Sequence, residues 1–182
     1  MLLARQKYLN GAAEYLLFMW QMEDLLRAVH FDIEMVESFI RSYVPDETCF
    51  QEERKWFKEL IQDMRSERIE TKGHLSALEE MMAELTYLHQ TLLKVWKDPQ
   101  YIQLYNEAKP NMEMYAIRAK GFGTNEVEMC LQALYGLLVL RLRKETISEE
   151  TQTAMSSFSS LMAALSQHYF AMKQGDQKAA LN

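Results

Sequence analysis

Residues 74–97, HLSALEEMMAELTYLHQTLLKVWK, decide the fold class of this 182-residue chain. The apolar positions of this stretch follow one another in alternating steps of three and four, which places their side chains along one side of an α-helix. These positions are Leu75, Leu78, Met82, Leu85, His89, Leu92 and Trp96. A helix buries such a stripe by packing against other helices, so the stretch predicts one member of an antiparallel helical bundle.

The same helical periodicity fills nearly every interval between the six glycines and three prolines of the chain, and no stretch alternates with a period of two. The predicted helices cover residues 4–29, 32–43, 45–71, 74–97, 99–119, 124–144 and 148–174. We therefore predict an all-α, single-domain bundle of about seven helices with short connections. Residues 1–175 would form the domain and residues 176–182 a disordered polar tail.

Local signals predict where several of these helices begin. Asp32, Asp98, Thr124 and Ser148 each stand in front of a periodic segment and are residue types that cap helix N-termini. The apolar phase continues straight through Pro110, which favours one kinked helix over two separate ones.

The helix near 125–144 is expected to be the central one, because it is apolar nearly all round after Ala133. Gly136, in its middle, costs about 1 kcal/mol in helix propensity relative to alanine. Close approach of a neighbouring helix is the favoured reason for a glycine here. A kink and a ligand placed against the backbone are the alternatives.

Composition argues against several classes of partner. The net charge of −6, with basic residues mostly interleaved with acidic ones, predicts no nucleic-acid partner and no acidic membrane surface. The longest apolar run, residues 137–140, is far below the ~18 residues that a membrane span needs, and the first ten residues do not resemble a signal peptide. Two widely separated cysteines, Cys49 and Cys130, indicate buried, reduced thiols in a cytoplasmic protein.

Recognisable catalytic and metal-binding patterns are missing from the sequence. No Glu-x-x-His pair occurs and no two histidines lie within one helical turn, so we predict no metal site. His89, in an apolar stripe, is interpreted as a hydrogen-bonded core histidine. The glycines at 121 and 123 lack the lysine of a phosphate-binding loop, and neither cysteine has a basic neighbour at a helix start. These observations predict no catalytic residue and no cofactor, and they favour a protein that is not an enzyme.

A second stretch, AEYLLFMWQMEDLLRA at residues 13–28, carries more apolar side chains than one helix stripe needs. Leu16 and Trp20 lie off the broad main stripe, beside Glu23 and Arg27, which are spaced as a surface ion pair. The favoured interpretation is that a neighbouring helix covers this flank as core. The alternative makes Leu16, Trp20 and Arg27 a contact surface for another chain.

Arg141 lies on the apolar side of its predicted helix, three, four and seven residues after leucines. The favoured interpretation is an arginine at the helix end that satisfies the last carbonyl groups. In the alternative, Arg141 pairs with Glu23 or Asp24 and forms a polar pocket for an anionic ligand.

The stretch at 13–28, together with NEVEMCLQALYGLLVLRLRKETISEET at residues 125–151, resembles a Bacteroidetes family of uncharacterised all-helical proteins, catalogued only as a domain of unknown function. The resemblance implies a bacterial, cytoplasmic, helical protein. It implies no activity, cofactor or catalytic residue.

The sequence as a whole favours a non-enzymatic binding module that acts through self-association or a protein partner. The alternative is a binder of a small anionic molecule, or an unrecognised enzyme, with its pocket near Arg141. A nucleic-acid regulator ranks third, because no helix-turn-helix with a basic recognition helix is present.

Overall fold

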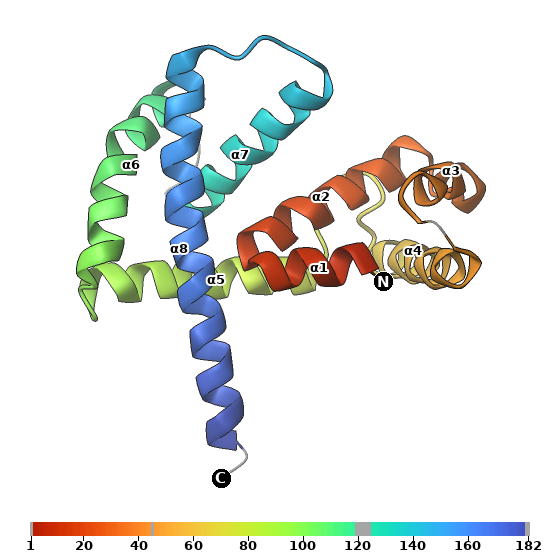
Figure 1. Cartoon of the computed structure of the whole chain (residues 1–182), viewed down its shortest axis with the longest axis horizontal. Coiled ribbons are helices and arrows are strands. Elements are labelled where there is room, and N and C mark those ends of the chain that lie inside the picture. Colours follow the sequence, from red (N-terminus) through yellow and green to blue (C-terminus); the bar gives the residue numbers. More distant parts are fainter. Residues whose placement is uncertain (1, 45, 119–124, 181–182) are drawn as a thin grey trace. The chain divides into compact units, whose positions relative to one another are not determined.

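The computed structural model describes residues 2–44, 46–118 and 125–180, and this part of the chain contains eight α-helices and no strand (Figure 1). In chain order they are α1 (Leu2–Asn10), α2 (Ala12–Ala28), α3 (Ile33–Tyr43), α4 (Glu47–Ser66), α5 (Ser76–Lys94), α6 (Pro99–Arg118), α7 (Glu126–Leu142) and α8 (Glu149–Ala180). The prediction of an all-α fold is confirmed. The extra helix arises at Gly11, which separates α1 from α2 where the sequence predicts one continuous helix.

The chain divides into two compact units, residues 1–80 and residues 81–182, and the boundary falls inside α5. The predicted limits of the domain, 1–175, and of a disordered tail, 176–182, stay predictions. The backbone of α8 continues as helix to Ala180, through most of the segment expected to be the tail. None of the described helices combines the length and the apolar character that crossing a bilayer requires.

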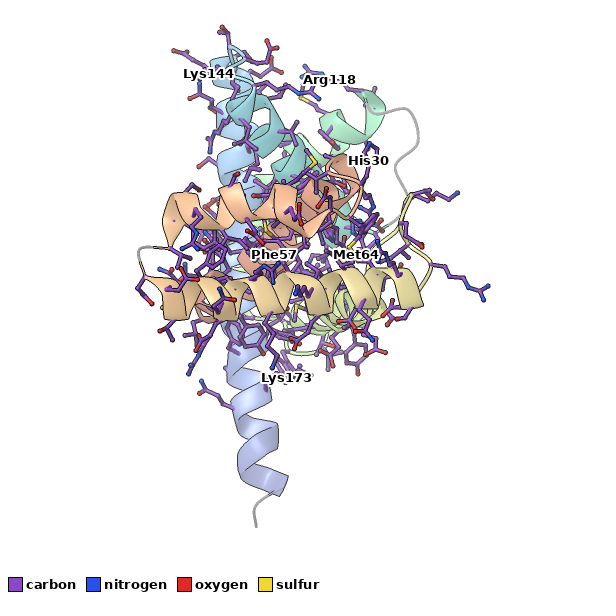
Figure 2. All side chains as sticks on the ribbon, turned by 90° about the vertical axis from the view of Figure 1, so that its right-hand side faces the viewer. His30, Phe57, Met64, Arg118, Lys144 and Lys173 are labelled. Carbon is purple, nitrogen blue, oxygen red and sulfur yellow. The ribbon has the colours of Figure 1, made fainter. Side chains whose placement is uncertain are left out.

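In the first unit, α1 packs against α2 and α3 packs against α4. The apolar stripe of α4 is fully buried, and Figure 2 shows Phe57 and Met64 on the side of α4 that faces the other helices of this unit. Aromatic rings also connect helices of this unit: Phe18 of α2 stacks on Trp56 of α4 at 6.2 Å between ring centres, and Phe39 of α3 meets Phe57 of α4 edge-on. Such ring pairs add stabilisation beyond the area that they bury.

In the second unit, α8 packs along both α6 and α7 (Figure 1). The buried side chains of α8 recur in helical steps, and they are Met155, Phe158, Leu161, Met162, Leu165 and Tyr169. The helix α6 runs unbroken through Pro110, which confirms the prediction of one helix at this point.

The helix starts that the sequence predicts are confirmed where the structure describes them. The side chain of Asp32 accepts a hydrogen bond from the Glu34 amide, and Asp98 accepts one from the Tyr101 amide. Ser148 likewise caps α8. Thr124, the cap expected for α7, lies outside the described residues.

Asn125 is the residue that caps α7. Its side-chain oxygen accepts hydrogen bonds from the amides of Val127 and Glu128, at 3.1 and 3.2 Å. The capping residue therefore lies one position later than the sequence predicts.

Two helix ends differ from the prediction. The helix α4 stops at Ser66 rather than near residue 71, and a loop leads from there to α5. The helix α5 stops at Lys94, after which Lys97 adopts a left-handed φ of 51°. Trp96 therefore leaves the predicted stripe and is 58% exposed, and the buried stripe of α5 ends at Leu92.

The burial of α7 is the reverse of what its composition predicts. The side chains that it buries belong mostly to its first half: Val127, Met129, Cys130, Leu131 and Ala133, followed only by Leu137. Beyond them Leu140 is 39% and Leu142 is 72% exposed. The enclosure expected of a central helix therefore does not extend to the C-terminal end of α7, where Leu137 is buried but Leu140 and Leu142 are exposed.

Candidate functional site

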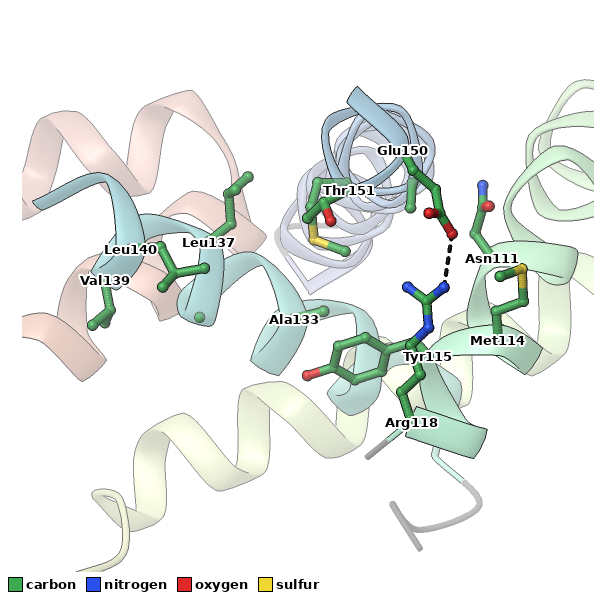
Figure 3. A pocket seen from close by; sticks show the side chains of 13 residues that line it. Asn111, Met114, Tyr115, Arg118, Ala133, Leu137, Val139, Leu140, Glu150 and Thr151 are labelled. Atoms are coloured by element: carbon green, nitrogen blue, oxygen red, sulfur yellow. Dashed lines mark hydrogen bonds and ion pairs between the residues drawn. The ribbon is translucent and has the colours of Figure 1, made fainter. Parts of the chain in front are cut away.

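A groove of about 520 Å³ opens between α6, α7 and α8 in the second unit (Figure 3). Met114 and Tyr115 line it from α6, Leu137 and Leu140 from α7, and Met155 from α8. The remaining lining residues are Asn111, Arg118, Ala133, Gly136, Val139, Glu150, Thr151 and Ala154. Ligand pockets in proteins have volumes of roughly 300–1,000 Å³ and mostly apolar walls with a few polar groups, and this groove has both properties.

The two charged side chains among the described residues of the groove neutralise each other. The Nη2 atom of Arg118 lies 2.8 Å from Oε1 of Glu150, and both side chains are well exposed to solvent (Figure 3). Of the polar lining residues, Asn111 donates a hydrogen bond to Ser157 at 3.0 Å. The walls therefore offer apolar contact, with an ion pair of no net charge between the last turn of α6 and the first turn of α8.

A hydrogen-bonded network in the same unit sets how α5, α6 and α7 lie. His89 of α5 is buried, with Nδ1 2.7 Å from the Tyr101 hydroxyl and Nε2 3.1 Å from Oε2 of Glu126. Tyr105 donates to the other oxygen of Glu126 at 2.8 Å. Because a carboxylate only accepts, Nε2 donates to Glu126, which in the neutral imidazole leaves Nδ1 to accept from Tyr101. The prediction that His89 is a hydrogen-bonded core histidine is confirmed.

The network and the groove together show in which direction α6 and α7 run relative to each other. Tyr105 in the first half of α6 meets Glu126 at the start of α7. Near the other ends of the same helices, Arg118 and Leu140 line the same groove. The two helices therefore run in the same direction, with the network towards their N-terminal ends and the groove towards their C-terminal ends.

Neither cysteine is an activated nucleophile. Burial, with a smaller contribution from Glu126, raises the pKa of Cys130 to about 12, so its thiol stays protonated near neutral pH. A hydrogen bond with Asp46 raises the pKa of Cys49 as well. The interpretation as buried thiols holds for Cys130, whereas Cys49 is half-buried. Among the residues that the structure describes, no group of three or more histidine, cysteine or carboxylate side chains is placed to hold a metal ion.

We predict that the hydrogen-bonded carboxylate of Glu126 makes the stability of the protein sensitive to acid. Hydrogen bonding from His89, and then from Tyr105, lowers the pKa of Glu126 below its usual 4.5. A carboxyl group whose pKa is lower in the folded state than in the unfolded state stabilises the fold when the pH is above the unfolded-state pKa. This stabilisation is lost as the pH falls through the folded-state pKa. Between about pH 5 and about pH 3, the melting temperature of the wild type should fall further than that of Glu126→Gln. Equal losses in a thermal melt series would contradict this role of Glu126.

A comparison with protein families matches residues 1–176 to the family described as Domain of unknown function (DUF4924). The chain belongs to this family. The match covers the groove and the His89 network as well as the first unit. Comparisons with curated proteins and with solved structures found no match.

In this DUF4924 protein the predicted flank of α2 is buried. Leu16 is fully buried and Trp20 is 6% exposed. The indole of Trp20 stacks on the imidazole of His74, with ring centres 4.7 Å apart and planes 23° from parallel. This is the arrangement expected of core side chains, and a contact of this flank with another chain stays a prediction.

The charged residues of the same flank do not form the predicted surface pair. The carboxylate of Glu23 is fully buried and is hydrogen-bonded to His74 and to the Leu75 amide. Arg27 instead pairs with Asp24 at 3.0 Å, and its guanidinium also donates to backbone carbonyls of the loop after α4, those of Ile69 and Gly73. Glu23 and Arg27 therefore tie α2 to this loop.

The alternative polar pocket at Arg141 has no support in these contacts. Arg141 is exposed near the C-terminal end of α7, in the second unit. Glu23 and Asp24 belong to the first unit, where His74 and Arg27 are their partners. Arg141 stands beside Leu142, the last residue of α7, and its interpretation as an arginine that satisfies the last carbonyl groups stays a prediction.

The groove is the feature that sequence reasoning missed. Its lining residues come from three helices, and none of them forms a motif with another. Gly136 was the one available signal, because a glycine in the middle of a helix is unfavourable. A Cβ atom built at Gly136 would meet no atom of the described residues within 4 Å, so none of the described helices makes the expected close approach to it.

Proposed function

We propose that this protein is a non-enzymatic binding protein that holds a small, largely apolar molecule in the groove between α6, α7 and α8. The observation that carries the proposal is the groove itself, about 520 Å³ of space with mainly apolar walls. Water forms few hydrogen bonds with apolar walls. An apolar molecule that displaces this water removes apolar surface from solvent, which favours binding.

Charge favours an uncharged ligand over the anionic one that the sequence suggests. Among the described residues of the lining, Arg118 is the one cationic side chain, and Glu150 already neutralises it. An anionic group would have to displace Glu150 from Arg118 or accept its repulsion. A neutral molecule meets neither cost.

The chemistry of the nearby network supports binding rather than catalysis. Both ring nitrogens of His89 are engaged by Tyr101 and Glu126. The Cys130 thiol is protonated and buried. These groups stabilise the arrangement of three helices and offer no activated nucleophile or base to a molecule in the groove.

A pair of variants on α7 tests the proposal. Leu140 lines the groove, and Leu142, two residues further on, does not. In a fluorescence titration with the neutral apolar dye N-phenyl-1-naphthylamine, we expect saturable binding to the wild type. We expect binding at least about tenfold weaker to Leu140→Glu, because the charge enters an apolar groove.

Leu142→Glu is the matched control, with the same substitution on the same helix. It should bind the dye like the wild type, and both variants should fold because both leucines are partly exposed. The proposal is wrong if the wild type shows no saturable binding, or if the two variants lose affinity equally.

A second candidate function, self-association or a protein partner, draws support from exposed apolar side chains near the groove. Ile117 on α6 is 79% exposed and Leu142 on α7 is 72% exposed. Exposed apolar patches often mark protein–protein contacts. Light scattering over a range of concentrations tests self-association: a dimer that Leu142→Glu dissociates supports it, and a monomer at every concentration contradicts it.

A further inference from the structure

Gly136 stands in the middle of α7 and lines the groove. Glycine in a helix interior is less favourable than alanine, because it loses more backbone freedom on folding. A conformational need for glycine is absent here, since Gly136 lies within the regular helix and its φ is not positive. The backbone conformation of α7 therefore does not account for glycine at this position.

Packing within the chain does not account for it either. A Cβ atom at Gly136 would meet no atom within 4 Å among the described residues, so the space beside the glycine is open. The helix also runs without interruption from Glu126 to Leu142. Close packing against a described neighbour is thus removed as the reason for this glycine. The open space beside Gly136 gives a molecule in the groove access to the backbone of α7.

We propose that Gly136 is the point where the ligand of the groove rests on the backbone of α7, and that the ligand is a neutral molecule with a broad apolar group, of the size of an aromatic or alicyclic ring. This inference depends on the proposed function. Ala133 on the same helix and Ala154 on α8 also line the groove with short side chains. A flat ring can make contact over such a surface, whereas a side chain at position 136 would occupy its place.

The substitution Gly136→Ala separates a ligand contact from a role in the fold. Alanine improves helix propensity and meets no neighbour, so the melting temperature should rise by about 2–4 °C. The added methyl group should weaken binding of N-phenyl-1-naphthylamine by about tenfold, because it fills space that the dye requires. Gly136→Leu should abolish saturable binding. Arg141→Ala, on the same helix and outside the groove lining, should leave the affinity unchanged.

The outcomes distinguish this inference from the proposed function. No saturable binding to the wild type overturns both. Binding that Leu140→Glu weakens and Gly136→Ala leaves intact overturns only the contact at Gly136. A melting temperature that falls in Gly136→Ala also overturns it, because the glycine would then serve the fold. Higher stability together with lower affinity is the result that supports the inference.

Discussion

Replacing Trp20 with alanine is expected to lower the free energy of unfolding by about 3–5 kcal/mol. The indole is 6% exposed and stacks on His74, so alanine would leave a large cavity beside that ring. The buried carboxylate of Glu23, which holds His74 and the Leu75 amide, lies one turn further along α2 and would lose part of its enclosure. Urea unfolding followed by circular dichroism measures the change.

Trp96→Ala is the matched control, because Trp96 is 58% exposed. Its effect should stay within about 0.5 kcal/mol. Light scattering on Trp20→Ala should give the same mass as the wild type. An unchanged stability together with a reduced mass would contradict the core position of Trp20 and restore the interpretation of the α2 flank as a contact surface.

The second large effect is expected for His89→Ala, which should destabilise the protein by about 2–4 kcal/mol. The imidazole is buried and joins α5 to Tyr101 of α6 and to Glu126 of α7. Alanine would leave the buried Tyr101 hydroxyl without this partner and would also create a cavity. Both losses act at the point where three helices meet.

His168→Ala provides the comparison within the same unit. His168 is partly exposed, and its Nε2 atom lies 4.0 Å from Asp98, so its removal should cost no more than about 1 kcal/mol. A double-mutant cycle between His89→Ala and Glu126→Gln should show coupling, because the two side chains share a hydrogen bond. Additive effects, or equal effects of the two histidine variants, would contradict the network.

Much of the fold could be predicted because the signals for a helix lie within a short stretch of sequence. The stripe from Leu75 to Leu92 and the caps at Asp32, Asp98 and Ser148 depend on residues only a few positions apart. Helix ends were less accurate. The exposure of Trp96 follows from the left-handed turn at Lys97, which apolar spacing does not report.

The candidate site could not be predicted in the same way. The apolar second half of α7 looks like core in the sequence, yet Leu140 and Leu142 are exposed. The sequence shows which side chains of α7 are apolar and on which side of the helix they recur. Whether another helix covers that side depends on the paths of α6 and α8. The same limit applies to Glu23, whose burial depends on a histidine 51 positions away.

The sequence by itself determined the all-α class, most helix starts and the absence of recognisable catalytic motifs, because these depend on local spacing and residue type. Only the tertiary structure decided that Trp20 belongs to the core, that Glu23 pairs with His74 rather than Arg27, and that the described residues leave open space beside Gly136. Those outcomes depend on contacts between segments far apart in the chain. A helix carries its apolar stripe in its own residues, whereas the neighbour that covers the stripe or leaves it open comes from elsewhere in the fold.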